Sequence, residues 1–572
     1  MLKVFARATR GIVNTSTVRR FESTITFRNP VHKATPYVRW SPRTMEAATI
    51  SAGPPPSTYP QTENTLPEKR KAAFPTASTN PKRPQHNRPR GDKKQRSKPV
   101  KEGGAEDVLN HDISDVLAAR TPEEAAQTPE RLDLWSEVDL PITSLSSSGD
   151  GLSYHRGRIY VVPFSLPGDT VRAKLIRHTD THTVTDFLSV LTPSPDRDDS
   201  LINCKYFGTC GGCQYQMMPY AAQLEHKRRV IERAYKNFSE MSGETLSILP
   251  PIGNTIGSPL KWGYRTKLTP HFDGPRRGGF TEHSPMPEIG FMQKGRRKTV
   301  DIEDCPIGTD SVRAGMAKSR AYVHENLRSY KKGATLLLRE STIRTPIPEA
   351  TTTEQNLAKY TEEKLCITDN NAESIEYIGD YKFISPAGQF FQNNNSILPI
   401  FTDFIRSNLA LPTTSTTSST TPPKYLVDAY CGSGLFTVTC GAAVERAIGV
   451  DISPESIEYA RRNAANNGIT NAKFIAGDAE KIFADIDFPG SETACILDPS
   501  RKGCDHLFLN QLLAFRPKRI VYVSCNVHTQ ARDLGFILDP KHEARYKVDS
   551  IVGFDFFPNT HHVESVAVLT LL

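Results

Sequence analysis

The sequence predicts a multidomain α/β protein whose C-terminal part is a Rossmann-like, doubly wound sheet. Strand-like and helix-like segments alternate from residue 424 to the end of the chain, which is typical of parallel sheets covered by helices. Residues 130–195 instead contain short strand-like runs separated by turn residues, a pattern that favours a small β-barrel. At 572 residues the chain is long enough for several hydrophobic cores, so we expect three or four domains.

The first 125 residues are expected to lie outside the folded domains. Residues 1–21 carry five Lys or Arg residues and no acid, which is typical of a mitochondrial transit peptide, although an unstructured basic tail fits the same composition. Residues 81–101 hold nine basic residues against one acid and are rich in Pro, Gln and Asn, so they cannot bury a core. This disordered basic arm is either a solvated linker or an RNA-binding or nuclear-import element. We expect a mitochondrial protein that could also have a nuclear or cytoplasmic pool.

Residues 130–195 are predicted to form the barrel. The runs VDLPI, GRIYVV and VRAKLI supply strands, and glycines between them supply tight turns. A basic barrel of this size commonly binds nucleic acid, and a purely structural barrel is the competing interpretation. The basic residues of the segment are Arg156, Arg158, Arg172, Lys174 and Arg177.

Residues 200–380 are predicted to form a mixed α+β central domain around a metal. A helix is expected over 221–237, and strands are expected near 264–272 and 289–293. Four cysteines in this region could supply a complete set of thiolate ligands: Cys204, Cys210, Cys213 and the more distant Cys305. Such a set suits zinc or an iron–sulfur cluster, and the spacing does not decide between them.

Residues 381–572 are predicted to form the doubly wound domain. Strands are expected at the runs KYLVDAY, AIGVD, KFIAGD, ACILDP and RIVYVSC, and helices are expected to begin near residues 435, 454 and 506. A polar Ser/Thr/Pro stretch at 411–423 is expected to be a surface insertion. Ligands of such sheets bind beyond the carboxyl ends of the strands, so we expect the chemistry at that edge.

A glycine-rich turn follows the first of these strands. Gly432 and Gly434 in DAYCGSG (428–434) allow the backbone to turn sharply and to approach a ligand. Asp451, at the end of the next strand, is placed to accept hydrogen bonds from ribose hydroxyls, and the segment GDAE (477–480) ends the strand after it. Because the turn lacks the G-x-G-x-x-G pattern of dinucleotide sites, the arrangement favours a pocket for S-adenosylmethionine.

A cysteine follows the last buried strand of this series. Cys525 lies in VYVSCN (521–526), where polar neighbours favour a reactive thiol over a buried structural one. The chain has ten cysteines, too few and too clustered for a secreted disulfide framework, so reduced thiols are expected. A thiol beside a methyl-donor pocket is typical of covalent catalysis.

Five motifs occur in order along residues 130–572: the basic barrel, the cysteine cluster, SPAGQFFQNN (385–394), DAYCGSG with LDPSRKG (497–503), and VYVSCN with HHVESV (561–566). In this series the chain resembles the RNA 5-methyluridine methyltransferases, TRAM-containing class I enzymes that depend on S-adenosylmethionine, and most closely their eukaryotic tRNA members. The resemblance implies an OB-like TRAM barrel. It also implies methylation of carbon 5 of a T-loop uridine in tRNA through a cysteine adduct at carbon 6. Ribosomal RNA is the alternative substrate, and an RNA-folding chaperone is the alternative from another class.

The resemblance also implies roles for individual residues. Cys525 matches the family's nucleophile and Glu564 its proton acceptor. Ser500 replaces the second proline of the family's usual Asp-Pro-Pro-Arg, a change that removes a restriction on the loop backbone. The cysteines are implied to hold a four-iron, four-sulfur cluster, with zinc as the alternative. The matches to the donor site are Gln392, Tyr430, Gly432, Gly434, Asp451 and Asp498, and those to the target base are Phe390, Asn394 and Asp498.

The expected partner is tRNA, and the formal net charge of +8 agrees with a polyanionic partner. A thiol cannot reach carbon 6 of a stacked uracil, so the target base must be flipped or splayed in a loop. We expect a monomer and no membrane insertion, because no apolar run is long enough to span a bilayer. Besides those of the barrel, the candidate phosphate-binding residues are Lys227, Arg228, Arg229, Lys294, Arg296, Arg297 and Lys298.

Overall fold

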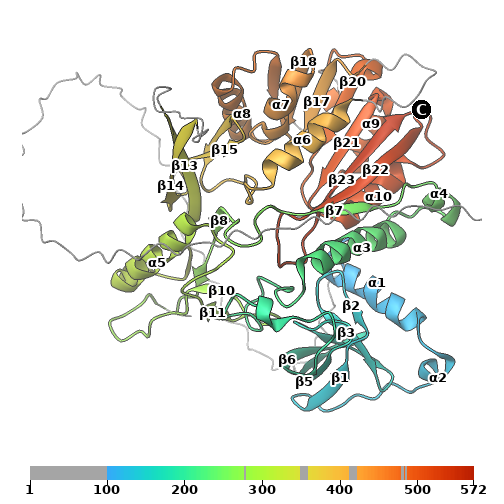
Figure 1. Cartoon of the computed structure of the whole chain (residues 1–572), viewed down its shortest axis with the longest axis vertical. Coiled ribbons are helices and arrows are strands. Elements are labelled where there is room, and N and C mark those ends of the chain that lie inside the picture. Colours follow the sequence, from blue (N-terminus) through green and yellow to red (C-terminus); the bar gives the residue numbers. More distant parts are fainter. Residues whose placement is uncertain (1–99, 276–277, 348–358, 411–421, 478–481, 484–485) are drawn as a thin grey trace, which may run out of the picture. The chain divides into compact units, whose positions relative to one another are not determined.

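The structure, a computed structural model, describes residues 100–275, 278–347, 359–410, 422–477, 482–483 and 486–572 (Figure 1). The expected transit peptide, the basic arm before residue 100, the insertion at 411–421 and residues 478–480 of GDAE lie outside the described residues. Among the described helices, none is both long enough and apolar enough to cross a membrane.

A six-stranded sheet forms where the sequence predicts a barrel. Its strands are β1 (Glu137–Pro141), β2 (Ser144–Leu145), β3 (Gly151–His155), β4 (Arg158–Val162), β5 (Thr170–His178) and β6 (His182–Thr192). Their order is β1-β5-β6-β4-β3-β2, with β4 and β6 parallel and the other neighbours antiparallel. Leu140, Tyr160 and Leu175 pack together in its core. The three strand-forming runs expected here are confirmed as β1, β4 and β5.

Two helices precede this sheet, so the expectation that the chain is unstructured up to residue 125 is wrong. They are α1 (Ala105–Ala118) and α2 (Pro122–Ala125). Val108 and Ile113 of α1 are buried. Asp112 accepts hydrogen bonds from the backbone N–H of Ser147 at 2.8 Å and from its hydroxyl at 2.9 Å, which ties the helix to the loop between β2 and β3. Composition alone missed α1 because its apolar face is narrow and the helix follows directly on the basic arm.

The central region contains short strands and three helices. The elements are α3 (Tyr220–Phe238), α4 (Gly243–Ser247), β7 (Gly253–Ile256), β8 (Lys267–Leu268), β9 (His271–Phe272), β10 (Gly290–Met292), β11 (Thr299–Asp301), α5 (Asp310–Glu325), β12 (Ala334–Thr335), β13 (Leu338–Pro346), β14 (Tyr360–Ile367), β15 (Glu373–Ile378) and β16 (Tyr381–Pro386). The predicted helix is confirmed as α3, which buries side chains three and four residues apart, among them Val230, Ile231 and Ala234.

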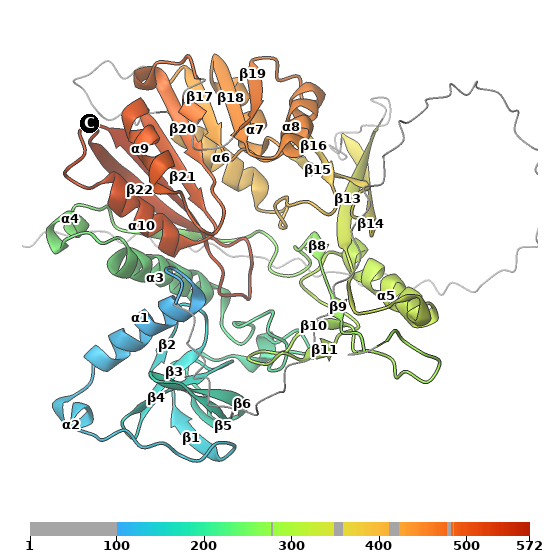
Figure 2. The ribbon, with the colours of Figure 1, turned by 180° about the vertical axis from the view of Figure 1, so that it is seen from behind.

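An eight-stranded sheet forms the C-terminal part, as predicted. Its order is β19-β18-β17-β20-β21-β23-β22-β7, with β17 to β21 parallel and β23 antiparallel to both neighbours. Helices α6, α7 and α8 pack on one face, and α3, α9 and α10 on the other (Figures 1 and 2). The elements are α6 (Leu398–Leu409), β17 (Tyr425–Ala429), α7 (Leu435–Cys440), β18 (Arg446–Asp451), α8 (Pro454–Asn466), β19 (Ala472–Ala476), β20 (Thr493–Leu497), α9 (His506–Phe515), β21 (Arg519–Ser524), α10 (Val527–Ile537), β22 (Tyr546–Phe554) and β23 (Glu564–Leu571).

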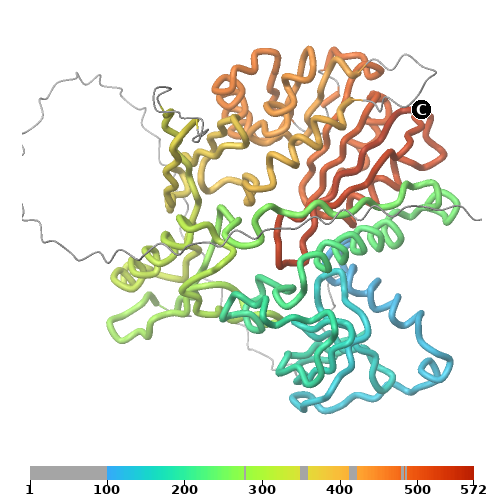
Figure 3. The backbone as a smooth tube through the Cα atoms, in the orientation of Figure 1, coloured from blue at the N-terminus to red at the C-terminus, as the bar shows by residue number. Residues whose placement is uncertain are grey.

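The last strand of this sheet comes from a distant part of the sequence. Strand β7 pairs in parallel with β22, and α3 packs against α10. Figure 3 shows the green segment after α3 running beside the red C-terminal strands. The sequence predicted a central domain at 200–380 and a methyltransferase domain at 381–572. In the structure, β7 and α3 come from the first of these segments but complete the sheet and the core of the second.

Candidate active site

Three candidate catalytic residues lie at one edge of the C-terminal sheet. Asp498 directly follows β20, Cys525 directly follows β21, and Glu564 is the first residue of β23. Strand β23 is antiparallel to β21, with Ser524 opposite Ser565, so its amino end lies beside the carboxyl end of β21. The structure thus brings the expected nucleophile, the expected proton acceptor and the expected aspartate together.

The charges around Cys525 control its reactivity. Burial, together with the carboxylates of Glu564 and Asp498, raises the pKa of the Cys525 thiol to about 12, against the opposing effect of the Arg501 guanidinium. Burial also raises the pKa of Glu564 to about 7, and Arg501 again opposes the shift. The free protein therefore holds a neutral thiol at neutral pH, and Arg501 is the cation that favours the thiolate when it forms.

The sequence predicted no function for Arg501, which lies in the motif LDPSRKG. The structure places it at a cavity of about 260 Å³ that Cys525 also lines, which we call the nucleophile cavity. His561 and His562 line the same cavity. Burial and neighbouring cations lower the pKa of His562 to about 4 and that of His561 well below its usual value, so both imidazoles are neutral at neutral pH. Neutral imidazoles can donate or accept hydrogen bonds to an uncharged base.

Hydrogen bonds restrain the loop after β20, in which Ser500 stands in place of the second proline of the family motif. Asn526 Nδ2 donates a hydrogen bond to the Arg501 carbonyl at 3.0 Å, and the Gly503 N–H donates to the Ser500 carbonyl at 2.9 Å. The Cys504 N–H donates to the Asp533 carboxylate at 2.7 Å. These contacts tie the loop to α10 and to the residue after Cys525.

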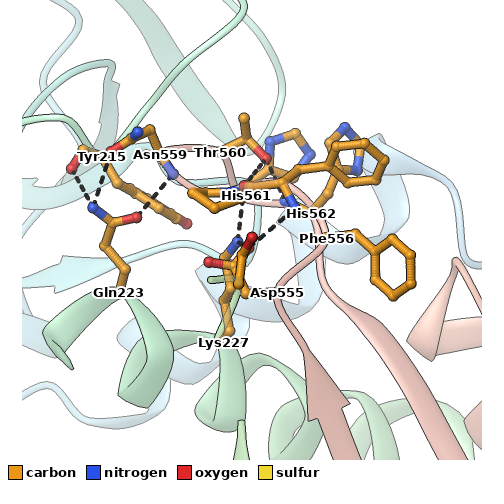
Figure 4. A network of polar contacts seen from close by, with 12 residues as sticks. Tyr215, Gln223, Lys227, Asp555, Phe556, Asn559, Thr560, His561 and His562 are labelled. Carbon is orange, nitrogen blue, oxygen red and sulfur yellow. Dashed lines mark hydrogen bonds and ion pairs between the residues drawn. The ribbon is translucent and has the colours of Figure 1, made fainter. Parts of the chain in front are cut away.

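The loop between β22 and β23, which ends at Glu564, is held by α3 (Figure 4). Lys227 Nζ contacts Asp555 Oδ1 at 2.5 Å and donates to the Phe557 carbonyl at 3.1 Å. The Asn559 N–H donates to Gln223 Oε1 at 2.9 Å, and the Gln223 amide donates to Asn559 Oδ1 at 3.2 Å. Lys227 is fully buried, so its expected role in holding phosphate is wrong.

Gln214, which directly follows the cysteine cluster, holds the same loop from the other side. Its N–H donates to the Asn559 carbonyl at 2.8 Å, and its side-chain oxygen accepts from the His561 N–H at 3.1 Å. The loop that leads to Glu564 is therefore held by α3 and by Gln214, both far away in the sequence.

The glycine turn after β17 has the geometry expected of a donor site. Gly432 and Gly434 have φ angles of 54° and 89°, and a side chain at Gly432 would point into open space, which leaves room for a ligand. The Gly432 N–H donates to Asp451 Oδ2 at 3.0 Å, so the turn and the end of β18 are linked. Tyr430 and Asp451 line a cavity of about 1170 Å³, which we call the donor cavity. These residues fit S-adenosylmethionine.

The residues of the motif SPAGQFFQNN differ in how far they are exposed to solvent. Phe390 is 76% exposed and free to stack on a ligand, whereas Gln392 is buried. Asn394 is fully buried; its amide donates to Ser258 Oγ and to the Phe556 carbonyl, at 3.0 and 2.9 Å. The Asn394 amide therefore joins Ser258 to the loop between β22 and β23, and the contact with the target base that the resemblance implies stays a prediction.

The four cysteines of the predicted metal site line one cavity of about 530 Å³. Within the described residues, no three His, Cys, Asp or Glu side chains lie close enough to hold a single metal ion.

Most of the remaining candidate phosphate-binding residues have protein partners. Arg158 is buried and donates to the carbonyls of Thr179 and His182 at 2.6 Å, so it is not available to bind phosphate, contrary to expectation. The other described ion pairs of this group join Arg228 to Glu225 and Glu232, Arg229 to Glu225, Lys294 to Asp150, Arg296 to Asp186, Lys298 to Glu288, Arg156 to Glu130 and Arg172 to Asp139.

Comparison with known proteins agrees with this site. The profile of the tRNA (Uracil-5-)-methyltransferase family matches residues 358–571. A tRNA (uracil(54)-C(5))-methyltransferase from Schizosaccharomyces pombe is 47% identical over 481 residues, which cover 84% of this chain and 85% of the relative. The enzyme of the same name from Saccharomyces cerevisiae is 41% identical over 506 residues, covering 81% of this chain and 78% of the relative.

A solved structure shares the fold. It is the Pyrococcus abyssi tRNA (uracil-54, C5)-methyltransferase in complex with S-adenosyl-L-homocysteine, which is 23% identical with a TM-score of 0.53 and covers 76% of this chain and 100% of its own. At that identity the likeness shows the fold alone, and the fungal relatives carry the assignment. The chain belongs to the tRNA (uracil-5-)-methyltransferase family.

Proposed function

We propose that this protein methylates carbon 5 of uridine 54 in tRNA, with S-adenosylmethionine as the methyl donor. The main support is the position of three side chains at one edge of the sheet, next to the glycine turn of the donor site. They are Cys525, Glu564 and Asp498. The substrate follows from the two fungal relatives, which are named for this reaction and match most of the chain.

The reaction needs a nucleophile, because carbon 5 of uracil is too electron-poor to attack a methyl group directly. Cys525 first loses its thiol proton to solvent; the thiolate Sγ then forms a bond to carbon 6, and the electron pair of the ring double bond shifts to give an enolate. Carbon 5 of the enolate then takes the methyl group that the bound donor supplies. Arg501 favours the thiolate electrostatically before this step.

The second half of the reaction removes the enzyme from its product. Glu564 takes the proton from carbon 5, the ring double bond re-forms, and the bond between Sγ and carbon 6 breaks to release the thiolate. A carboxyl whose pKa lies near 7 is suited to this task, because roughly half of it is ionised at neutral pH and the ionised form is still basic enough to accept the proton.

Purified protein tests the assignment directly. Wild-type protein, tRNA transcript and S-adenosylmethionine are expected to give 5-methyluridine by nucleoside mass spectrometry, and Cys525→Ala is expected to give none while still binding tRNA. A tRNA with 5-fluorouridine at position 54 should form a covalent complex with wild-type protein, because the fluorine cannot be removed as a cation. Methylation of ribosomal RNA in place of tRNA would overturn the substrate. Full function of Cys525→Ala in cells would favour an RNA chaperone.

We also propose that Cys204, Cys210, Cys213 and Cys305 hold a four-iron, four-sulfur cluster. Support comes from the thiol donor set and from its arrangement around one cavity. When bound, the cluster would join the Cys204–Cys213 segment to the chain at Cys305; methyl transfer needs no redox step. Protein purified without oxygen is expected to contain iron and acid-labile sulfide in equal amounts, and Cys305→Ser is expected to lose both. Zinc without sulfide would contradict the proposal.

A further inference from the structure

The chain just before α1 lies against the active site. Residues 101–105, which we call the strap, contact the first turn of α10, the helix that begins directly after Cys525 and Asn526. Asn526 Nδ2 donates to the Gly103 carbonyl at 3.4 Å and to the Arg501 carbonyl at 3.0 Å. One amide beside the nucleophile therefore holds both the strap and the loop that carries Arg501.

The strap is a well-anchored segment because α1 continues from it. Asp112 of α1 is bound to the β2–β3 loop through Ser147, and Arg233 of α3 approaches it at 3.4 Å. Lys236 of α3 pairs with Asp115 at 2.7 Å. These contacts fix α1 between the N-terminal sheet and α3, so the position of the strap is set by the surrounding fold.

The strap borders both cavities of the site. Lys101, Gly103, Gly104 and Ala105 line the nucleophile cavity, whereas Glu102 lines the donor cavity. Gly103 has a φ of 63°, and a side chain on it would lie 3.2 Å from Thr529 Cγ2 of α10. A glycine is therefore needed for the strap to pass so close to the helix.

Two exposed cations face the nucleophile cavity from opposite segments. Lys101 comes from the strap and Arg501 from the loop after β20, and both side chains are exposed. Within the described part of the chain, no carboxylate forms an ion pair with either of them. A nucleotide that enters the cavity brings a phosphate with it, and two unpaired cations at the rim suit that charge.

We propose that the strap forms one wall of the pocket for the target nucleotide and that Lys101 binds the RNA backbone next to the flipped uridine. This inference rests on the proposed function, since it concerns the RNA that enters the nucleophile cavity. It gives the segment before the N-terminal sheet a direct place in substrate binding, beside the barrel-like sheet and the methyltransferase sheet.

The test compares three variants of the full-length protein: Lys101→Glu, Lys101→Arg and the control Lys473→Glu. Lys473 is an exposed lysine on β19, at the far edge of the sheet from β21, so the control makes the same charge change away from the cavity. Lys101→Glu is expected to weaken tRNA binding roughly tenfold and to lower the salt dependence of binding by about one unit. The Kd for S-adenosylmethionine should not change. Lys101→Arg should bind like wild type.

A photo-crosslinking amino acid at position 101 gives an independent readout. It is expected to crosslink to the T-loop within a nucleotide or two of the target uridine. Equal tRNA affinity of Lys101→Glu and wild type, or crosslinks far from the target, would overturn the inference. Wild-type protein that methylates no tRNA would instead overturn the proposed function, so the two failures are distinguishable.

Discussion

Replacing Glu564 with Gln is expected to stop the enzyme after methyl transfer, with the methylated RNA still bound to Cys525. Gln has the same shape as Glu, so the buried site keeps its packing, but its amide cannot take the proton from carbon 5. The Sγ–carbon 6 bond then cannot break, and turnover should fall by about 10²- to 10⁴-fold. Denaturing gels of the variant with tRNA and S-adenosylmethionine should show a stable protein–RNA band.

The pH dependence of the wild-type enzyme should follow the same carboxyl. A base acts in its deprotonated form, so the rate of adduct breakdown should rise as the pH increases through about 7, where Glu564 ionises, and level off above it. Glu564→Gln should lose this inflection, and Cys525→Ala/Glu564→Gln should form no covalent band. Normal turnover by Glu564→Gln would show that another group accepts the proton.

Replacing Lys227 with Met is expected to destabilise the protein by about 3–5 kcal/mol, because it leaves the fully buried Asp555 carboxylate without its counter-ion. Both side chains are removed from water, so neither charge has a solvent substitute. The same change frees the loop that ends at Glu564. Urea unfolding followed by circular dichroism should show the loss as a lower midpoint.

A second variant shows whether the loss of stability comes from the unpaired charge or from the changed packing. Lys227→Met combined with Asp555→Leu removes both charges and should recover most of the stability, because no uncompensated charge remains in the core. A single variant as stable as wild type would mean that water reaches Asp555 in solution. A double variant no better than the single one would mean that shape, and not charge, decides the stability here.

Residues at strand ends were the most predictable part of the site. Cys525 and Asp451 each lie at the end of an apolar run, and parallel strands bring their carboxyl ends to one edge, so local patterns predicted where they lie. Asp498 ends such a run too, but its role was assigned only through the family resemblance. Glu564 could be assigned only through the family resemblance, since a single carboxylate in HHVES carries no local signal.

Contacts between distant segments were beyond sequence reasoning. Lys227 lies in a basic run that looks solvent-exposed, yet it is buried against Asp555. Sequence patterns could not show this, because the two residues are 328 positions apart. Asn394 sits in a motif that suggests ligand binding, but its amide is used to join Ser258 to the β22–β23 loop. The strap and strand β7 were missed for the same reason: neither has a strong pattern of its own, and each is defined by the surface that it covers.

The origin of β7 has a consequence for how the protein is made. The C-terminal sheet can close only after β22 has emerged from the ribosome, so β7 and α3 are synthesised first and must wait for about 290 residues of later chain before they find their partners. Until then α3 presents an apolar face, and in a fragment that begins at residue 381 the edge of β22 would stay unpaired. The C-terminal sheet is therefore not complete in its own segment of the chain: its last strand and part of its core come from β7 and α3, which precede it in the sequence.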